Sequence, residues 1–248
     1  MSNDRVRRVW AQAARQSRGA TVSVAHVCTA VLAAVKVDGA GVTVKVSRTV
    51  RETVQATDAV AARLEELQLT FGEGPCVDTL DGGGPVLAVD LRFSEYLARW
   101  PAFAPAALDS GARAVFALPL QIGAIQLGVL NLYRFRPGGL GLYELADALA
   151  FADIVGMLLL DGAAGGPPDT AELTWQFEDP SSRNAFVHQA TGMMLVQLGT
   201  SAATAFARLR AYAFAHNRRL NDVACDVVER RLRFDPDPHP DRRADDPS

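Results

Sequence analysis

Apolar and polar positions along the first part of the chain follow two different periods, which predicts both helices and strands. Apolar residues recur at three- and four-residue spacing in 22–37, as on one face of an amphipathic helix, and 4–17 also has a helical pattern. Valines alternate with polar residues through Val42–Ser47, which is typical of a half-buried strand. A second short strand is expected near 52–56, and Asp58 is placed to cap the helix that follows it.

Glycine and proline divide the next hundred residues into short elements. Gly72, Gly74 and Pro75 exclude a continuous helix there, and a glycine-rich loop at 81–85 precedes a short strand. The later elements are expected, in order, as a helix over 94–109 broken at Trp100-Pro101, strands at 112–120 and 124–135 forming an antiparallel hairpin, and an apolar helix over 143–160.

This order of elements predicts an α+β fold with an antiparallel sheet and grouped helices, followed by a separate all-α module. Residues 162–181 have the composition of a linker, and the proline-rich tail after Phe234 that of a disordered segment. The predicted organisation is an N-terminal helical extension at 1–19, an α+β domain at 20–161, the linker at 162–181, a three-helix domain at 182–234 and the tail at 235–248.

The three-helix domain is expected to begin with a helix that ends at Gly199 and has Phe186, Ala190, Met194 and Leu198 on one face. Ser201 should cap the second helix. That helix is expected to bury Ala202, Ala205, Phe206, Leu209 and Ala213, and the third Leu220, Val223, Ala224 and Val227.

Charge is distributed unevenly between these regions. Residues 182–234 contain eight arginines, no lysine and three acids, a net charge of +5 in a chain whose total is −3. A compact basic module on an acidic carrier suggests a polyanionic partner for that module, although a solvated arginine face is the plain alternative.

Composition excludes several other classes. No apolar run is long enough for a membrane helix, and the basic start lacks the apolar core of an export signal. The three cysteines are widely spaced and no histidine lies at metal-ligand spacing, so we expect a reduced, cytoplasmic protein with no metal site, no certain cofactor and no catalytic constellation.

Residues 20–160 resemble the GAF family of small ligand-sensing α+β domains, in particular the version found in actinobacterial regulators. The resemblance rests on GEGPC and VDTL in 72–80, GGPVLAVDL in 83–91, the stretch 99–120 and LGVLNLYRFRPGG in 127–139. It implies a pocket for an unknown small molecule between the sheet and the central helices and loops. The wall implied by position consists of Cys76, Val77, Trp100, Phe103, Phe116, Asn131 and Tyr133.

Cys76 is the one reactive group in that wall. If it opens a short helix, the helix dipole would lower its pKa and suit a redox sensor or a reductase, but a small buried thiol is the plainer interpretation. An enzyme would need a resolving cysteine or a partner constellation, and neither is visible.

The basic module looks like an ANTAR domain, the RNA-binding output module of transcription antitermination regulators. The matching residues run from Gln189-Ala190 through Gly192-Met193-Met194-Leu195 and the block Ala205–Ala213 to His216–Ala224. Two departures are Thr191, where relatives usually carry a lysine, and Thr204, where a glutamate would complete a capping box with Ser201.

This resemblance implies a homodimer that binds paired hairpins in an mRNA leader. The expected RNA contacts are Arg210, Arg218 and Arg219, then Arg183, Arg208, Gln189, His216 and Asn217. A DNA-binding output is the alternative, although Asp222, Asp226 and Glu229 do not suit a groove-reading helix.

Overall fold

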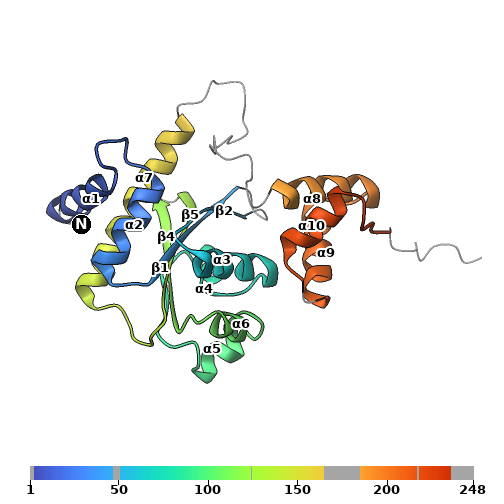
Figure 1. The fold of residues 1–248 in the computed structure, drawn as a ribbon, viewed down its shortest axis with the longest axis horizontal. Coiled ribbons are helices and arrows are strands. Elements are labelled where there is room, and N and C mark those ends of the chain that lie inside the picture. Colours follow the sequence, from blue (N-terminus) through green and yellow to red (C-terminus); the bar gives the residue numbers. More distant parts are fainter. Residues whose placement is uncertain (1–2, 47–50, 124, 165–184, 217, 236–248) are drawn as a thin grey trace, which may run out of the picture. The chain divides into compact units, whose positions relative to one another are not determined.

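The computed structural model describes residues 3–46, 51–123, 125–164, 185–216 and 218–235. The chain divides into two compact units, Met1–Pro180 and Ser181–Ser248, which are treated separately below (Figure 1).

The N-terminal unit is built on a five-stranded antiparallel sheet with the order β2-β1-β5-β4-β3. The strands are β1 (Gly39–Lys45), β2 (Arg51–Ala56), β3 (Val86–Ala88), β4 (Ala114–Ile122) and β5 (Ile125–Arg134). The predicted hairpin is β4–β5, which pairs from Ile122 with Ile125 to Ala114 with Arg134.

One face of the sheet is covered by the long apolar helix α7 (Leu142–Ala164) and by α2 (Val24–Val35), and α1 (Asn3–Gln16) packs on both helices (Figure 1). Alternate strand residues such as Val42, Phe116 and Leu130 point into this layer and are fully buried with Val31 and Phe151. The period of two along each strand therefore directs these side chains to the first core.

The opposite face carries α3 (Ala59–Phe71), α4 (Pro75–Gly82), α5 (Ser94–Arg99) and α6 (Phe103–Asp109). Leu64 and Leu67 of α3 pack there with Trp100, Phe103 and Val115 in a second core. The break predicted at Trp100-Pro101 separates α5 from α6. Asp58 caps α3 as predicted, because its carboxylate accepts hydrogen bonds from the backbone N–H groups of Val60 and Ala61.

One strand differs from its prediction. The valine alternation predicts a half-buried strand, but β1 lies between β2 and β5 and both its faces are covered, so that Thr43 is only 6% exposed. A polar residue in an alternating pattern can face solvent or a second layer of helices, and here α3 provides that layer.

The C-terminal unit contains three described helices, α8 (Ala185–Leu198), α9 (Ala202–Ala215) and α10 (Leu220–Val228), which pack against one another (Figure 1). Gly199 ends α8 with a positive φ of 59°, and Ser201 Oγ caps α9 by accepting from the Thr204 N–H at 3.1 Å. Thr204 therefore does not prevent the cap. The four residues predicted inside α10 are buried.

Two expectations for this unit need correction. Phe186 is 40% exposed, because the inward face of α8 is made by Val187, Ala190, Thr191 and Met194. Ala202 lies exposed in the first turn of α9. The third helix ends at Val228, since Arg230 has a left-handed φ of 61° and the chain turns there.

Candidate functional site

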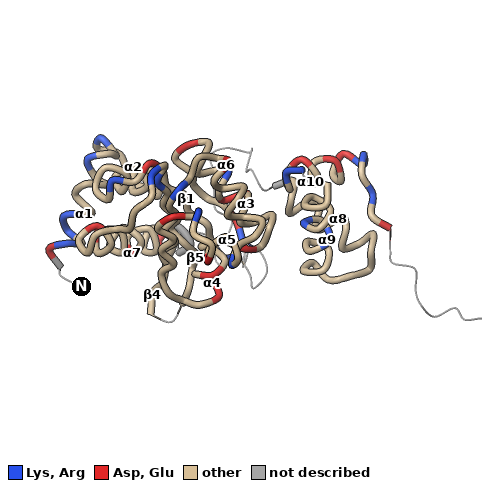
Figure 2. Tube along the Cα trace, turned by 90° about the horizontal axis from the view of Figure 1, so that it is seen from below, with Lys and Arg blue, Asp and Glu red and all other residues tan. Residues whose placement is uncertain are grey.

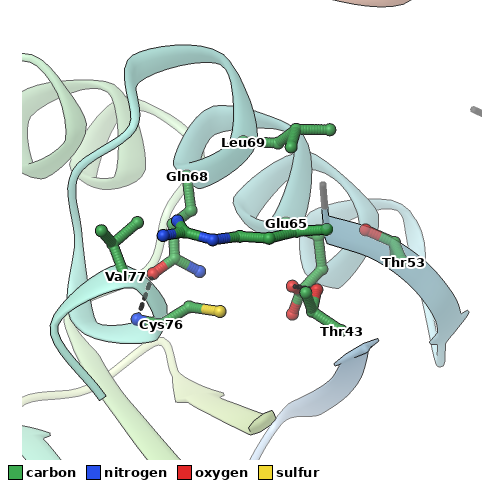
Figure 3. Close-up of a pocket in the computed structure, with 8 residues that line it drawn as sticks. Thr43, Thr53, Glu65, Gln68, Leu69, Cys76 and Val77 are labelled. Carbon is green, nitrogen blue, oxygen red and sulfur yellow. Dashed lines mark hydrogen bonds between the residues drawn. The ribbon is translucent and has the colours of Figure 1, made fainter. Parts of the chain in front are cut away.

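A small cavity lies on the α3 and α4 face of the sheet (Figure 3). Its volume is about 10 Å³, which suffices for roughly one water molecule. Side chains from β1, β2, α3 and α4 line it: Thr43, Arg51, Thr53, Glu65, Gln68, Leu69, Cys76 and Val77.

The central group of this site is the Glu65 carboxylate, whose residue is only 3% exposed. Its Oε2 accepts a hydrogen bond from Thr43 Oγ1 at 2.6 Å, and both carboxylate oxygens accept from Asn131 Nδ2 at 2.9 and 3.0 Å. Gly41 on β1 makes room for it, because a Cβ at this position would collide with the Glu65 side chain.

Burial raises the pKa of Glu65 to about 7, although the hydrogen bonds from Thr43 and Asn131 lower it in part. Burial disfavours the ionised carboxylate because the interior solvates charge poorly, whereas donors to its oxygens favour it. The carboxyl group therefore exchanges its proton near neutral pH, where an exposed glutamate is fully ionised.

Two amide side chains beside Glu65 have unused polar atoms. Gln68 Oε1 accepts from the Cys76 backbone N–H at 2.7 Å, and this bond is the dashed line in Figure 3. Gln68 Nε2 and Asn131 Oδ1 are buried and have no hydrogen-bond partner among the described residues. Such atoms carry a desolvation cost that a water or a small polar ligand would relieve.

Cys76 lies at the start of α4, as predicted, but its thiol does not have the expected chemistry. Burial, followed by the charge of Glu65, raises its pKa to about 12, so the thiol stays protonated at neutral pH. The expected lowering by the helix dipole is outweighed by desolvation in a fully enclosed position. A protonated thiol is a poor nucleophile, and this geometry does not favour redox or reductase chemistry.

The seven residues expected to form a pocket wall are dispersed in the structure. Cys76 and Val77 line the cavity, and Asn131 reaches Glu65 from β5. Trp100 and Phe103 pack in the second core. Tyr133 donates its hydroxyl to Asp58 Oδ1 at 2.9 Å, away from the cavity.

Phe116 lies on the other face of the sheet. The alternation along β4 sends it into the first core, where the Arg134 guanidinium lies 5.6 Å from its ring centre.

Glu65 and Gln68 were not among the expected pocket residues, although a signal for them exists. The buried residues of α3 include Ala61, Leu64, Glu65 and Gln68, which are spaced i, i+3, i+4 and i+7. This is the period of a buried helical face, and it contains two polar residues that a search for apolar positions passes over.

In the C-terminal unit, arginines lie within α9 and beside both ends of α10 (Figure 2). Asp226 on α10 holds two of them: Arg218 Nη2 lies 2.6 Å from its Oδ2, and Arg231 Nε donates to Oδ1 at 2.7 Å. Arg231 also pairs with Glu229. The two guanidinium groups lower the pKa of Asp226, which is therefore ionised over the whole neutral range.

The other expected RNA contacts have varied surroundings. Arg210 lies 5.8 Å from the centre of the Phe206 ring, and Arg208 Nη1 donates to the Asp235 carbonyl at 3.3 Å. The His216 ring stacks on Tyr212, with ring centres 3.9 Å apart. Gln189 is exposed on α8 and Arg219 at the start of α10, whereas Arg183 and Asn217 lie outside the described residues.

Two further arginines, which were not among the expected RNA contacts, are also exposed where they could contact a polyanion. Arg230 and Arg233 follow α10, are exposed and form no ion pair with a described residue. They lie beyond the last helical turn because the chain bends at Arg230.

No group of three or more His, Cys, Asp and Glu side chains in the described ranges is arranged to hold a metal ion. Among the same residues, none of the helices has the length and apolar character needed to cross a bilayer.

The family model of the ANTAR domain matches residues 180–228, which include α8, α9 and α10. These residues are an ANTAR domain. The match agrees with the resemblance noted in the sequence motifs. A search of curated protein sequences finds no match to the chain.

The N-terminal unit has a GAF-like fold, which one solved structure shows. The GAF domain of a phosphoenolpyruvate-protein phosphotransferase from Coxiella burnetii aligns with a TM-score of 0.51 and 15% identity, over 66% of this chain and 98% of that one. The corresponding Acinetobacter GAF domain aligns with a TM-score of 0.48 and 14% identity, over 68% and 100%. At such identity the first likeness establishes the fold alone.

Proposed function

We propose that this protein is a signal-responsive transcription antitermination regulator that binds hairpin RNA through its ANTAR domain. The match of the ANTAR family model to residues 180–228 is the observation that carries the proposal. The net charge of +5 on residues 182–234 supports it, because RNA binding depends on cations that contact phosphates. In this proposal the protein is a cytoplasmic homodimer and not an enzyme.

The arginines divide into two roles. Asp226 orients Arg218 through a single nitrogen, Nη2, so the rest of this guanidinium still presents N–H groups to a phosphate. Arg231 is held by both Asp226 and Glu229. Arg219, Arg230 and Arg233 are exposed around them. Tyr212 and His216 add a stacked aromatic pair that suits an unpaired base of a hairpin loop.

The N-terminal unit supplies the signal in this proposal. Its cavity holds a carboxyl group that titrates near neutral pH and two unused amide atoms. A small polar molecule, or a proton, that changes the state of Glu65 would alter the packing of α3 against β1.

The test compares a two-hairpin RNA with duplex DNA of equal length in a gel-shift titration of the full chain. We expect preference for the RNA, because the acidic residues of α10 repel a DNA groove. Arg218→Glu with Arg219→Glu should weaken RNA binding by at least about a hundredfold, since two attractive contacts become repulsive.

The matched control is Arg92→Glu with Arg136→Glu, which makes the same charge change at two exposed positions of the N-terminal unit. Circular dichroism checks that α8, α9 and α10 remain folded in each variant. Preference for the duplex DNA, or an equal loss in the control, contradicts RNA binding by the ANTAR domain.

A further inference from the structure

The N-terminal helix α1 contains a second cluster of arginines. Residues 1–19 contain Arg5, Arg7, Arg8, Arg15 and Arg18 against one acid, Asp4, a net charge of +4. Residues 20–181 have a net charge of −9, so this helix is a basic element on an acidic unit. Figure 2 shows the basic residues along it.

Two of these arginines fasten the helix to the unit. Arg8 Nη2 lies 2.6 Å from Asp147 Oδ1 on α7, and Arg5 Nε lies 3.1 Å from the same oxygen. Val9 and Ala13, both fully buried, pack the apolar face of α1 into the first core. The orientation of α1 on its unit is therefore determined by both packing and charge.

The other three arginines do not take part in that contact. Arg7, Arg15 and Arg18 are exposed and form no ion pair with any described residue. Arg7 and Arg15 are eight residues apart and lie about 12 Å from each other along the helix. Arg18 follows in a left-handed turn with a φ of 48°, again on the solvent side. Trp10, which is 40% exposed, lies at the edge of this face.

We infer that the outer face of α1, formed by Arg7, Arg15, Arg18 and Trp10, binds the phosphate backbone of single-stranded RNA. All its cations are arginines, the side chain best suited to phosphate contacts, and the exposed indole offers a platform on which a base can stack. Because about 12 Å of helix separates Arg7 from Arg15, their guanidinium groups can contact different phosphates of one strand. This contact has no base specificity and would add to hairpin recognition.

A membrane surface fits the same face less well. Basic amphipathic helices bind bilayers by inserting their apolar face, whereas the apolar face of α1 is already packed against α2 and α7. Among the described residues of this helix, Trp10 is the one large apolar side chain left exposed to insert.

The inference takes from the proposed function that RNA is the polyanion, and its test separates the two. The full chain and the variant Arg7→Gln/Arg15→Gln are titrated with a mixed-sequence single-stranded RNA at several salt concentrations. Loss of two phosphate contacts should reduce the slope of log K against log salt by about 1.4, so that a fourfold reduction in salt widens the affinity ratio about sevenfold.

The control Arg92→Gln/Arg136→Gln, with the same change in net charge, should leave the slope as in the wild type. An unchanged slope in the α1 variant, or an equal change in the control, overturns the inference. Binding to phosphatidylserine vesicles that depends on Arg7 and Arg15, without a change in the RNA slope, also overturns it and assigns the face to a membrane.

The two-hairpin RNA reports on the proposed function independently. If the α1 variant keeps the preference for hairpins over duplex DNA while its slope falls, both the proposed function and the inference are supported. The wild type could instead show no hairpin preference while the slope of log K against log salt still depends on Arg7 and Arg15. In that case the proposed function fails, and the inference that α1 binds RNA is still supported.

Discussion

The two units place their polar side chains in opposite locations. In the N-terminal unit Glu65, Gln68 and Asn131 are at most 5% exposed; the first two line a cavity, and Asn131 donates to Glu65. In the described part of the C-terminal unit, Thr191 alone is a buried polar residue, and the ion pairs of Asp226 lie at the surface. A buried carboxyl group can respond to one proton or one small molecule, whereas surface charges act together on a large polyanion.

Glycines of the two units also differ in the space available for a Cβ atom. Gly41 and Gly128 of the sheet have no space for a Cβ, because it would meet Glu65 in the first case and the Thr43 backbone in the second. At Gly192 of α8, a Cβ would have nothing within 4 Å among the described atoms. The N-terminal unit is close-packed around its polar site, and the corresponding surface of the C-terminal unit is open.

The largest expected effect comes from a substitution that disrupts this packing. Gly128→Ala should lower the free energy of unfolding of the N-terminal unit by about 3 kcal/mol, because the clash is with backbone, which cannot rotate away. Chemical denaturation followed by Trp100 fluorescence measures it. Gly192→Ala is the control and should stabilise α8 by up to about 1 kcal/mol. If Gly128→Ala and Gly192→Ala both change the free energy of unfolding by a similar small amount, the two units do not differ in how tightly they pack around these glycines.

A second prediction concerns pH. Glu65 keeps its proton up to a pKa of about 7 in the folded state, against an ordinary value of 4.5. The folded state therefore binds more protons between these values, and its stability, complete below pH 4.5, falls as the pH rises through 7. Glu65→Gln should remove this fall, which approaches about 1.4 kcal/mol per pH unit.

Denaturant midpoints across pH 5 to about 8 measure the difference between the wild type and the variant. The control is Glu66→Gln, at a neighbouring, partly exposed residue that pairs with Arg63. It should keep the wild-type dependence of the denaturant midpoint on pH. A wild type whose slope matches that of Glu65→Gln would show that the carboxyl group is ionised in the folded protein.

The smallest effect concerns the surface charges. Asp226→Asn releases Arg218 and leaves Arg231 paired with Glu229 alone, so affinity for unstructured RNA should rise a few-fold at low salt while hairpin preference falls. Asp222→Asn changes net charge equally at an exposed position of the same helix and should leave the hairpin preference intact. Identical behaviour of the two variants would assign the effect to net charge alone and not to the orientation of the arginines.

Much of the fold could be predicted because local chemistry determines it. The cap at Asp58, the break at Trp100-Pro101 and the end of α8 at Gly199 each depend on one residue and its immediate neighbours. The C-terminal core was also predictable, since its alanines and leucines recur at helical spacing. The least accurate prediction there was the face of α8, where Thr191 is inward and Phe186 outward.

The candidate site was harder to predict because it joins distant segments. Glu65 meets Thr43 and Asn131, which are 22 and 66 residues away. The ion pair between Arg218 and Asp226 likewise forms across a turn and a helix. No periodic pattern relates such residues, since their contact depends on strand order and helix packing.

The sequence by itself determined the two kinds of unit, the caps and breaks of their helices and the basic character of the ANTAR domain, because periodicity, turn chemistry and charge are local properties. The tertiary structure decided which polar residues are buried. Strand pairing places Gly41 and Asn131 opposite each other, and α3 covers them, so Glu65 enters the interior and its pKa rises. The desolvation that gives this carboxyl group its chemistry exists only when β1, β5 and α3 are assembled.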